Sequence, residues 1–131
     1  MPGCHVQPEQ MFNLIWGYNA IYKERISNTN ANAGTNFLYG TVVPTGQLWV
    51  GASLVGFNVN RSPTAISLGL YDGTTWYNLT QRAGAGAGVT IEWTGLAPLA
   101  AGSRFFAYIT GCAAGDDIYL DIVGYKMVLT Q

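Results

Sequence analysis

The stretch Thr64–Gln81, TAISLGLYDGTTWYNLTQ, contains two strand-like runs on either side of Asp72-Gly73. In the first run, large apolar residues alternate with small ones, which is the period of a half-buried strand. Asp-Gly is a strong signal for a hairpin turn, because both turn positions favour positive φ. The stretch therefore predicts an antiparallel hairpin in which Thr64–Tyr71 pairs with Thr75–Gln81.

Similar short runs continue along the chain after residue 34, separated by turn signals such as Pro44-Thr45-Gly46. The other runs are Phe37–Val43, Gln47–Val59, Val89–Thr94, Phe105–Thr110 and Ile118–Leu129. Gly124, inside the last run, indicates a β-bulge. Short, evenly spaced strands with Gly and Pro turns, and no helix of core length, are typical of a sandwich or barrel. The sequence therefore predicts an all-β fold, whose strand order periodicity cannot show.

The first 34 residues differ in character from the rest of the chain. They mix Pro, Gln, Asn and isolated aromatic residues without a period, and residues 27–34 form a polar, turn-rich segment. We predict an N-terminal arm or linker over residues 1–34 and a β-sandwich domain over residues 35–131. The arm residues that we expect to bind a partner are Phe12, Leu14, Trp16, Tyr18 and Tyr22.

Two interpretations of this apolar arm remain open at this point. An apolar segment ahead of a complete β-domain can dock onto another chain, for example by adding a strand to a sheet edge. Alternatively, it forms a strand that closes the domain's own sheet.

The composition excludes several classes of protein. A chain of 131 residues has the length of a single domain. With 49% hydrophobic and 10% charged residues it is not disordered. A net charge of -1 without a basic patch argues against nucleic-acid binding, and no apolar run reaches the roughly 20 residues of a membrane span. Low charge with many aromatic residues is instead typical of a surface that contacts partner proteins.

Few residues offer catalytic or metal-binding chemistry. The single histidine, His5, lies in the arm, so a nucleophile–histidine site is not expected. Cys4 and Cys112 are too far apart for a metal motif and are expected to be free thiols. Glu92 and Asp121 are the carboxylate pair that a small hydrolase would need. We expect no enzyme activity, no metal and no cofactor.

Exposed aromatic residues allow a second function, the binding of carbohydrate or a receptor. The candidate ligand-binding residues are Trp76 and Tyr77 beside a turn and Asp116 and Asp117 within one. Aromatic rings can stack on a sugar face, although in a sandwich of this size several must also fill the core. The two aspartates have a structural alternative as well, because turns favour Asp for its bonds to the local backbone.

Two runs carry a resemblance to a family of virus proteins. Phe37–Val50, with its Val-Pro-Thr-Gly turn before Trp49-Val50, resembles the opening strands of small tailed-phage β-sandwich proteins. Ala114–Lys126, with Gly-Asp-Asp before an alternating strand and Gly-Tyr, is similar to their final strand. Together the runs bracket most of the chain, and their spacing resembles that of jelly-roll virion components.

The resemblance implies an antiparallel jelly-roll-like β-sandwich with an extended N-terminal arm. It implies a phage virion structural protein that decorates and stabilises the capsid by binding assembled shell subunits. The implied partners are the major capsid protein or other virion proteins, and the chain is expected to form a homotrimer. The implied location is the virion, with synthesis in the host cytoplasm, and no catalytic residues carry over.

Overall fold

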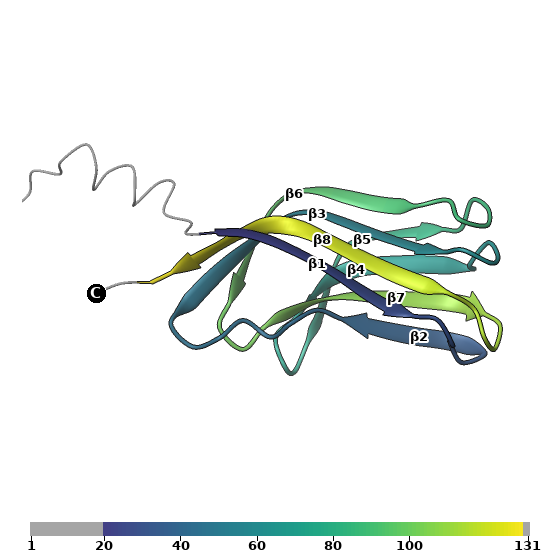
Figure 1. Cartoon of the computed structure of the whole chain (residues 1–131), viewed down its shortest axis with the longest axis horizontal. Helices are drawn as coiled ribbons and strands as arrows, with labels where there is room; N and C mark the ends of the chain where they lie inside the picture. The colour runs from purple at the N-terminus through teal and green to yellow at the C-terminus, as the bar shows by residue number, and fades with distance from the viewer. Residues whose placement is uncertain (1–19, 130–131) are drawn as a thin grey trace, which may run out of the picture.

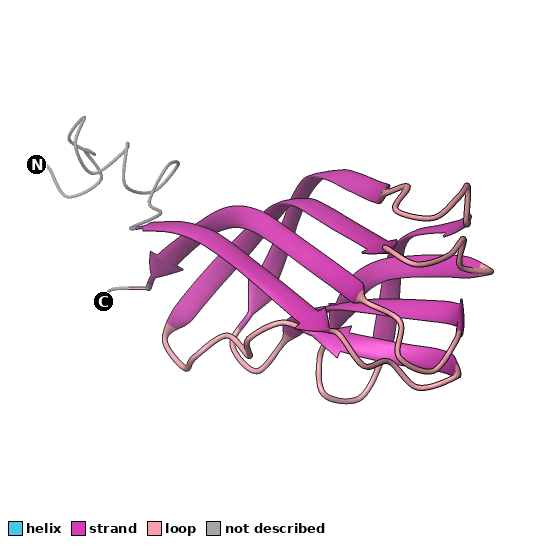
Figure 2. Ribbon diagram, turned by 45° about the vertical axis from the view of Figure 1, so that its right-hand side comes forward, coloured by secondary structure: helices cyan, strands magenta, loops and turns pink. Residues whose placement is uncertain are grey.

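The computed structural model describes residues 20–129, which form two packed antiparallel sheets. The strands are β1 (Ala20–Asn28), β2 (Gly34–Tyr39), β3 (Gln47–Asn58), β4 (Ala65–Tyr71), β5 (Trp76–Ala83), β6 (Ile91–Ala100), β7 (Arg104–Cys112) and β8 (Ile118–Val128). One sheet has the order β1-β8-β3-β6 and the other β2-β7-β4-β5 (Figure 1). Loops join the strands at both ends of the sandwich, and the described part contains no helix (Figure 2). The all-β sandwich is confirmed, and its strand order is that of a jelly roll.

The predicted hairpin is present, with β4 and β5 joined through Asp72–Thr75. The Asp72 carboxylate accepts hydrogen bonds from the backbone N–H groups of Thr74 at 2.9 Å and Thr75 at 2.7 Å. Gly73 has a φ of +97°, a conformation that favours glycine. The turn therefore uses glycine for its backbone shape and aspartate for its side-chain bonds.

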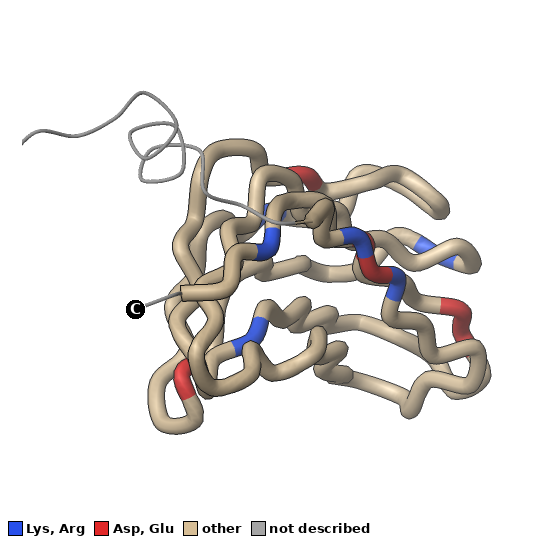
Figure 3. The backbone as a smooth tube through the Cα atoms, turned by 60° about the vertical axis from the view of Figure 1, so that its left-hand side comes forward, with Lys and Arg blue, Asp and Glu red and all other residues tan. Residues whose placement is uncertain are grey.

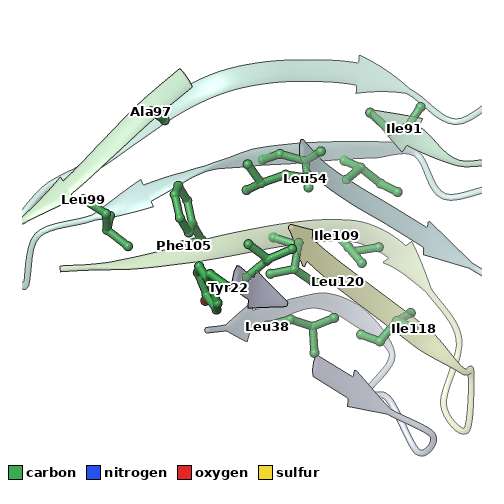
Figure 4. Close-up of a cluster of buried hydrophobic side chains, with 14 of the residues drawn as sticks. Tyr22, Leu38, Leu54, Ile91, Ala97, Leu99, Phe105, Ile109, Ile118 and Leu120 are labelled. Carbon is green, nitrogen blue, oxygen red and sulfur yellow. The ribbon is translucent and has the colours of Figure 1, made fainter. Parts of the chain in front are cut away.

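The core lies between the two sheets and is filled by the inward-facing side chains of each strand. Figure 4 shows Leu54 and Leu99 of one sheet meeting Phe105 and Ile109 of the other, and all four are essentially inaccessible to solvent. Alternation places these residues on one side of each strand and polar or aromatic residues on the other. Within residues 20–129, every buried side-chain nitrogen or oxygen has a hydrogen-bond partner.

The predicted boundary at residue 34 is wrong, because β1 belongs to the sandwich. β1 pairs with β8 along its whole length, from Ala20 opposite Lys126 to Asn28 opposite Ile118. Tyr22, predicted to bind a partner, is only 2% exposed, and its ring centroid lies 4.7 Å from that of Trp49. For residues 20–28, the alternative of a strand closing the domain's own sheet is correct.

The polar segment at residues 27–34 is also folded and carries the chain from one sheet to the other. Ala31 is buried and exchanges backbone hydrogen bonds with the β7–β8 loop, through Asp116 at 3.0 Å and Gly115 at 2.9 Å. The Asn36 side chain both accepts from and donates to the backbone of Asn32. Residues 27–34 therefore form an ordered connection between the two sheets and not a flexible linker.

Candidate functional site

The outer face of the sheet β2-β7-β4-β5 carries a shallow hollow of about 270 Å³, which we call the trough. The lining residues are Phe37, Ser67, Trp76, Asn78, Gln81, Phe106 and Tyr108. They come from all four strands of the sheet and include no charged side chain.

Cross-strand register explains why the surface is hollowed there. Ser67 lies between Tyr108 of β7 and Gln81 of β5, and Gly69 lies between Phe106 and Asn78 in the next row. β4, one of the two central strands of the sheet, thus presents two small residues while its neighbours β7 and β5 present longer ones. A depression along β4 follows from this difference in side-chain size.

Aromatic rings form one part of the trough and support one another. The Phe37 ring centroid lies 4.7 Å from that of Tyr108 and 6.0 Å from that of Trp76. Trp76 stacks on Tyr71 at 4.5 Å, and its indole N–H donates to the Tyr39 hydroxyl at 3.2 Å. These contacts hold the Trp76 ring in place although 48% of the residue is exposed.

The remaining lining is polar and neutral. Ser67 and Phe106 are both buried, whereas the amides of Asn78 and Gln81 are exposed. The nearby cation of Arg104 lies 4.0 Å above the Tyr39 ring and is not among the lining groups. The trough therefore combines exposed aromatic surface with amide donors and acceptors, without a net charge.

The outer face of the other sheet, which we call the apolar face, is different in character. Its apolar residues include Ile21, Val50, Val55, Phe57, Pro98, Tyr119, Val123 and Tyr125. One row runs across all four strands, with Tyr125 and Val50 between Ile21 and Pro98. Ile21 is 67% exposed and Val123 is 50% exposed. Large apolar residues so exposed and so close together mark a surface suited to a protein contact.

Charged residues are sparse on the molecule, and one group of both signs stands out along neighbouring strands (Figure 3). On the apolar face, both carboxylate oxygens of Asp121 accept hydrogen bonds from Arg25, each at 2.7 Å. Glu92 lies on the far side of Val55 from Asp121, two strands away, so the backbones are roughly 10 Å apart. The pair considered for hydrolysis thus shares a face, with one member held by a guanidinium group.

A second polar group joins two loops at one end of the sandwich. Asp116 is 2% exposed, and its carboxylate accepts bonds from Arg61 at 2.6 Å, Asn58 at 3.0 Å and the Ala113 N–H at 2.8 Å. The hydrogen bonds from Arg61 and then Asn58 hold the pKa of the Asp116 carboxyl well below its ordinary value. Nearby Cys112 is a buried free thiol, and burial raises its pKa.

The structure does not bring the four candidate ligand residues together. Trp76 faces the trough, whereas the next residue, Tyr77, lies on the other side of β5. There Tyr77 is paired with Leu70, which packs against the core. Asp116 and Asp117 follow the end of β7, but Trp76 lies near its beginning, where Tyr71 pairs with Arg104. The Asp116 carboxylate, moreover, already accepts hydrogen bonds from Arg61, Asn58 and the Ala113 N–H of this chain.

Phe12, Leu14, Trp16 and Tyr18 lie outside the described residues, as do Cys4 and His5. Sequence reasoning missed Phe37, Asn78, Gln81 and Tyr108 as lining residues of the trough. A usable signal did exist in the second arm of the hairpin, where an aromatic residue and amides alternate at Trp76, Asn78 and, after one extra residue, Gln81.

Among residues 20–129, no group of three or more His, Cys, Asp or Glu side chains is placed to hold a metal ion. The same part of the chain contains no helix with the length and hydropathy of a membrane span.

Comparisons with known proteins show a distant structural resemblance to a virus chain. No family model matches the sequence, and no curated protein matches it. A chain in the structure of infectious bursal disease virus, Gt strain, aligns over 96% of this chain with 16% identity and a TM-score of 0.33. The aligned region spans about a third, 35%, of the viral chain. At this identity and TM-score the likeness carries no conclusion about the fold or the role of this chain.

Proposed function

We propose that this chain is a non-enzymatic virion structural protein that decorates and stabilises a phage capsid by binding assembled shell subunits. The observation that carries the proposal is the apolar face, where Ile21 and Val123 are largely exposed on neighbouring strands. In a monomer this surface would stay in contact with water. Docking on a shell subunit would remove it from water and would be favourable in proportion to the apolar area buried.

The sparse charge of the chain supports the same role. Six basic and seven acidic residues leave a net charge of -1, so neighbouring copies crowded on one shell would repel each other weakly. A protein that binds only the assembled shell adds its binding free energy to the stability of that state. Stabilisation then follows from attachment alone and requires no catalytic group.

We expect the double substitution Ile21→Lys, Val123→Lys to weaken attachment about thirtyfold. Each lysine would add a charge without a partner to the apolar part of the contact, and anchor residues at interfaces can contribute more than about 1 kcal/mol each. Co-sedimentation with shells assembled without the protein measures the change. Val42→Lys is the matched control, because Val42 is also half exposed but lies in the β2–β3 loop. Equal co-sedimentation of the double variant and the control would contradict the assignment of the apolar face.

Deletion of residues 1–19 tests the predicted role of Phe12, Leu14, Trp16 and Tyr18 as anchors. The deletion must stop before Ala20, because removal of β1 would remove Tyr22 from the core. We expect the shortened protein to fold, to lose most of its attachment, and to leave the melting temperature of the shells unchanged. Undiminished attachment would eliminate the arm from the proposal and leave the apolar face as the attachment surface.

The proposed homotrimer is tested separately, by measuring the mass of the intact chain with light scattering.

A further inference from the structure

We propose that the trough is a binding site for neutral carbohydrate, with Trp76 as its stacking platform and Asn78 and Gln81 as its hydroxyl-binding groups. This site lies on the sheet β2-β7-β4-β5, away from the apolar face on the other sheet. It is therefore independent of the proposed attachment to a shell. Its ligand would be an uncharged hexose or a chain of such sugars.

Exposed aromatic surface supports the role of Trp76 as a platform on which a sugar ring stacks. One face of a hexose ring presents several C–H groups that carry partial positive charge, and the face of an aromatic ring is negative. Trp76 and Phe37 are 48% and 42% exposed although they lie at the lining of a concave surface. Contacts with Tyr71 and Tyr39 fix the orientation of the indole, so little side-chain freedom is lost on binding.

The side-chain amides of Asn78 and Gln81 support their role in binding sugar hydroxyls. Each amide offers a donor and an acceptor a short distance apart, which matches a pair of neighbouring sugar hydroxyls. Asn78 and Gln81 are exposed, and within residues 20–129 neither side chain makes a hydrogen bond to another protein group. The hydroxyl of Ser67, a residue that is only 4% exposed and lines the trough, adds a further polar contact.

The absence of charge in the lining selects the kind of sugar. The seven lining residues include no Lys, Arg, Asp or Glu, and the Arg104 guanidinium is engaged above the Tyr39 ring. An acidic sugar would give up hydration without gaining an ion pair, which is unfavourable. A neutral sugar exchanges its hydration for amide hydrogen bonds and ring contact.

The size of the trough sets the mode of binding. Its volume of about 270 Å³ lies just below the roughly 300–1,000 Å³ of pockets that enclose drug-sized ligands. A sugar would therefore lie across the open surface along β4, with one face on the aromatic rings and the other toward solvent. Binding of this kind is modest in affinity per site and gains strength when several copies are displayed together.

The test is a binding screen of the full chain against neutral and acidic oligosaccharides immobilised on an array, followed by titration of the best neutral binder in solution. Tryptophan fluorescence and ligand NMR report the binding. We expect Trp76→Ala and Asn78→Ala each to weaken binding about tenfold or more. Trp76→Phe should retain part of it, because the ring is smaller but still present.

Tyr77→Ala is the matched control, because Tyr77 is 49% exposed and adjacent to Trp76 but lies on the other side of β5. Circular dichroism confirms that each variant is folded. Failure of the full chain to bind any neutral sugar on the array would overturn the proposal. Binding that survives Trp76→Ala and Asn78→Ala, or that is lost equally in Tyr77→Ala, would place the sugar elsewhere and overturn it too. Shell attachment is measured separately, so neither result depends on the other.

Discussion

Gly124→Ala is expected to destabilise the fold by about 3 kcal/mol or more, which is a large part of the stability of a domain of this size. Gly124 is buried in β8 opposite Gly51 of β3, beside the irregularity at which β3 carries one extra residue, Ala52. A β-carbon on Gly124 would overlap the carbonyl oxygen of Val50. Because that obstacle is backbone in a central strand, relief requires the two strands to separate and their hydrogen bonds to stretch.

Denaturation in urea measures the effect, and Gly56→Ala provides the matched control. A β-carbon on Gly56 would lie 3.1 Å from a γ-methyl group of Ile66 and a δ-methyl group of Leu68, which are side-chain atoms rather than backbone and can yield by a few tenths of an ångström. We expect the control to lose only about 1 kcal/mol. Similar losses in both variants would mean that the sheet accommodates the methyl group at Gly124, contrary to the packing described.

Asp116→Ala is expected to lower the melting temperature by roughly 10 °C or more, because it leaves several donors without their acceptor. Arg61, Asn58 and the Ala113 N–H all donate to this nearly inaccessible carboxylate. Their bonds tie the β3–β4 loop and the end of β3 to the β7–β8 loop. Asp117→Asn is the matched control in the same turn, because the Asp117 bond to Asn60 is made by its backbone N–H. A melting temperature in Asp116→Ala equal to that of the control would contradict the role of the cluster.

The same carboxylate predicts how stability changes with pH. Its pKa in the folded protein is lowered, chiefly by Arg61, relative to about 3.9 for an unfolded aspartate. Its contribution is therefore fully present above about pH 4 and is lost as the pH falls through the lowered folded pKa. Urea midpoints between pH 7 and pH 2.5 should fall more steeply for the natural protein than for Asp116→Asn. Parallel curves would show that the pKa of Asp116 is the same in the folded and unfolded states.

The hairpin and the sandwich could be predicted from sequence because their signals are local. Alternation along Thr64–Tyr71 and the Asp72-Gly73 turn depend on neighbouring residues, and both appear in β4 and its turn. β1 could not be recognised in this way, because Glu24 interrupts its inward-facing side. The structure supplies that carboxylate with the Tyr22 hydroxyl and with the backbone and hydroxyl of Thr41.

The candidate sites show the same division. Trp76 could be singled out from the sequence, because it is a tryptophan beside a turn. Its neighbour Tyr77 is also an aromatic residue beside that turn, so the sequence alone does not distinguish the two. Only the register of β4 and β5 places the first on the trough and the second on the other side. Asp116 and Asp117 are likewise adjacent in one turn, yet only Asp116 meets Arg61.

The sequence by itself determined the all-β class of this protein, the position of its main hairpin and the low charge of its surface. These properties depend on period, turn chemistry and composition, which are contained in short stretches of chain. The tertiary structure alone decided that residues 20–28 close a sheet, that Phe37 lies beside Trp76, and that Ile21 continues the row of Tyr125 and Val50. Such contacts join residues distant in sequence, and they depend on strand order and register, which no local pattern specifies.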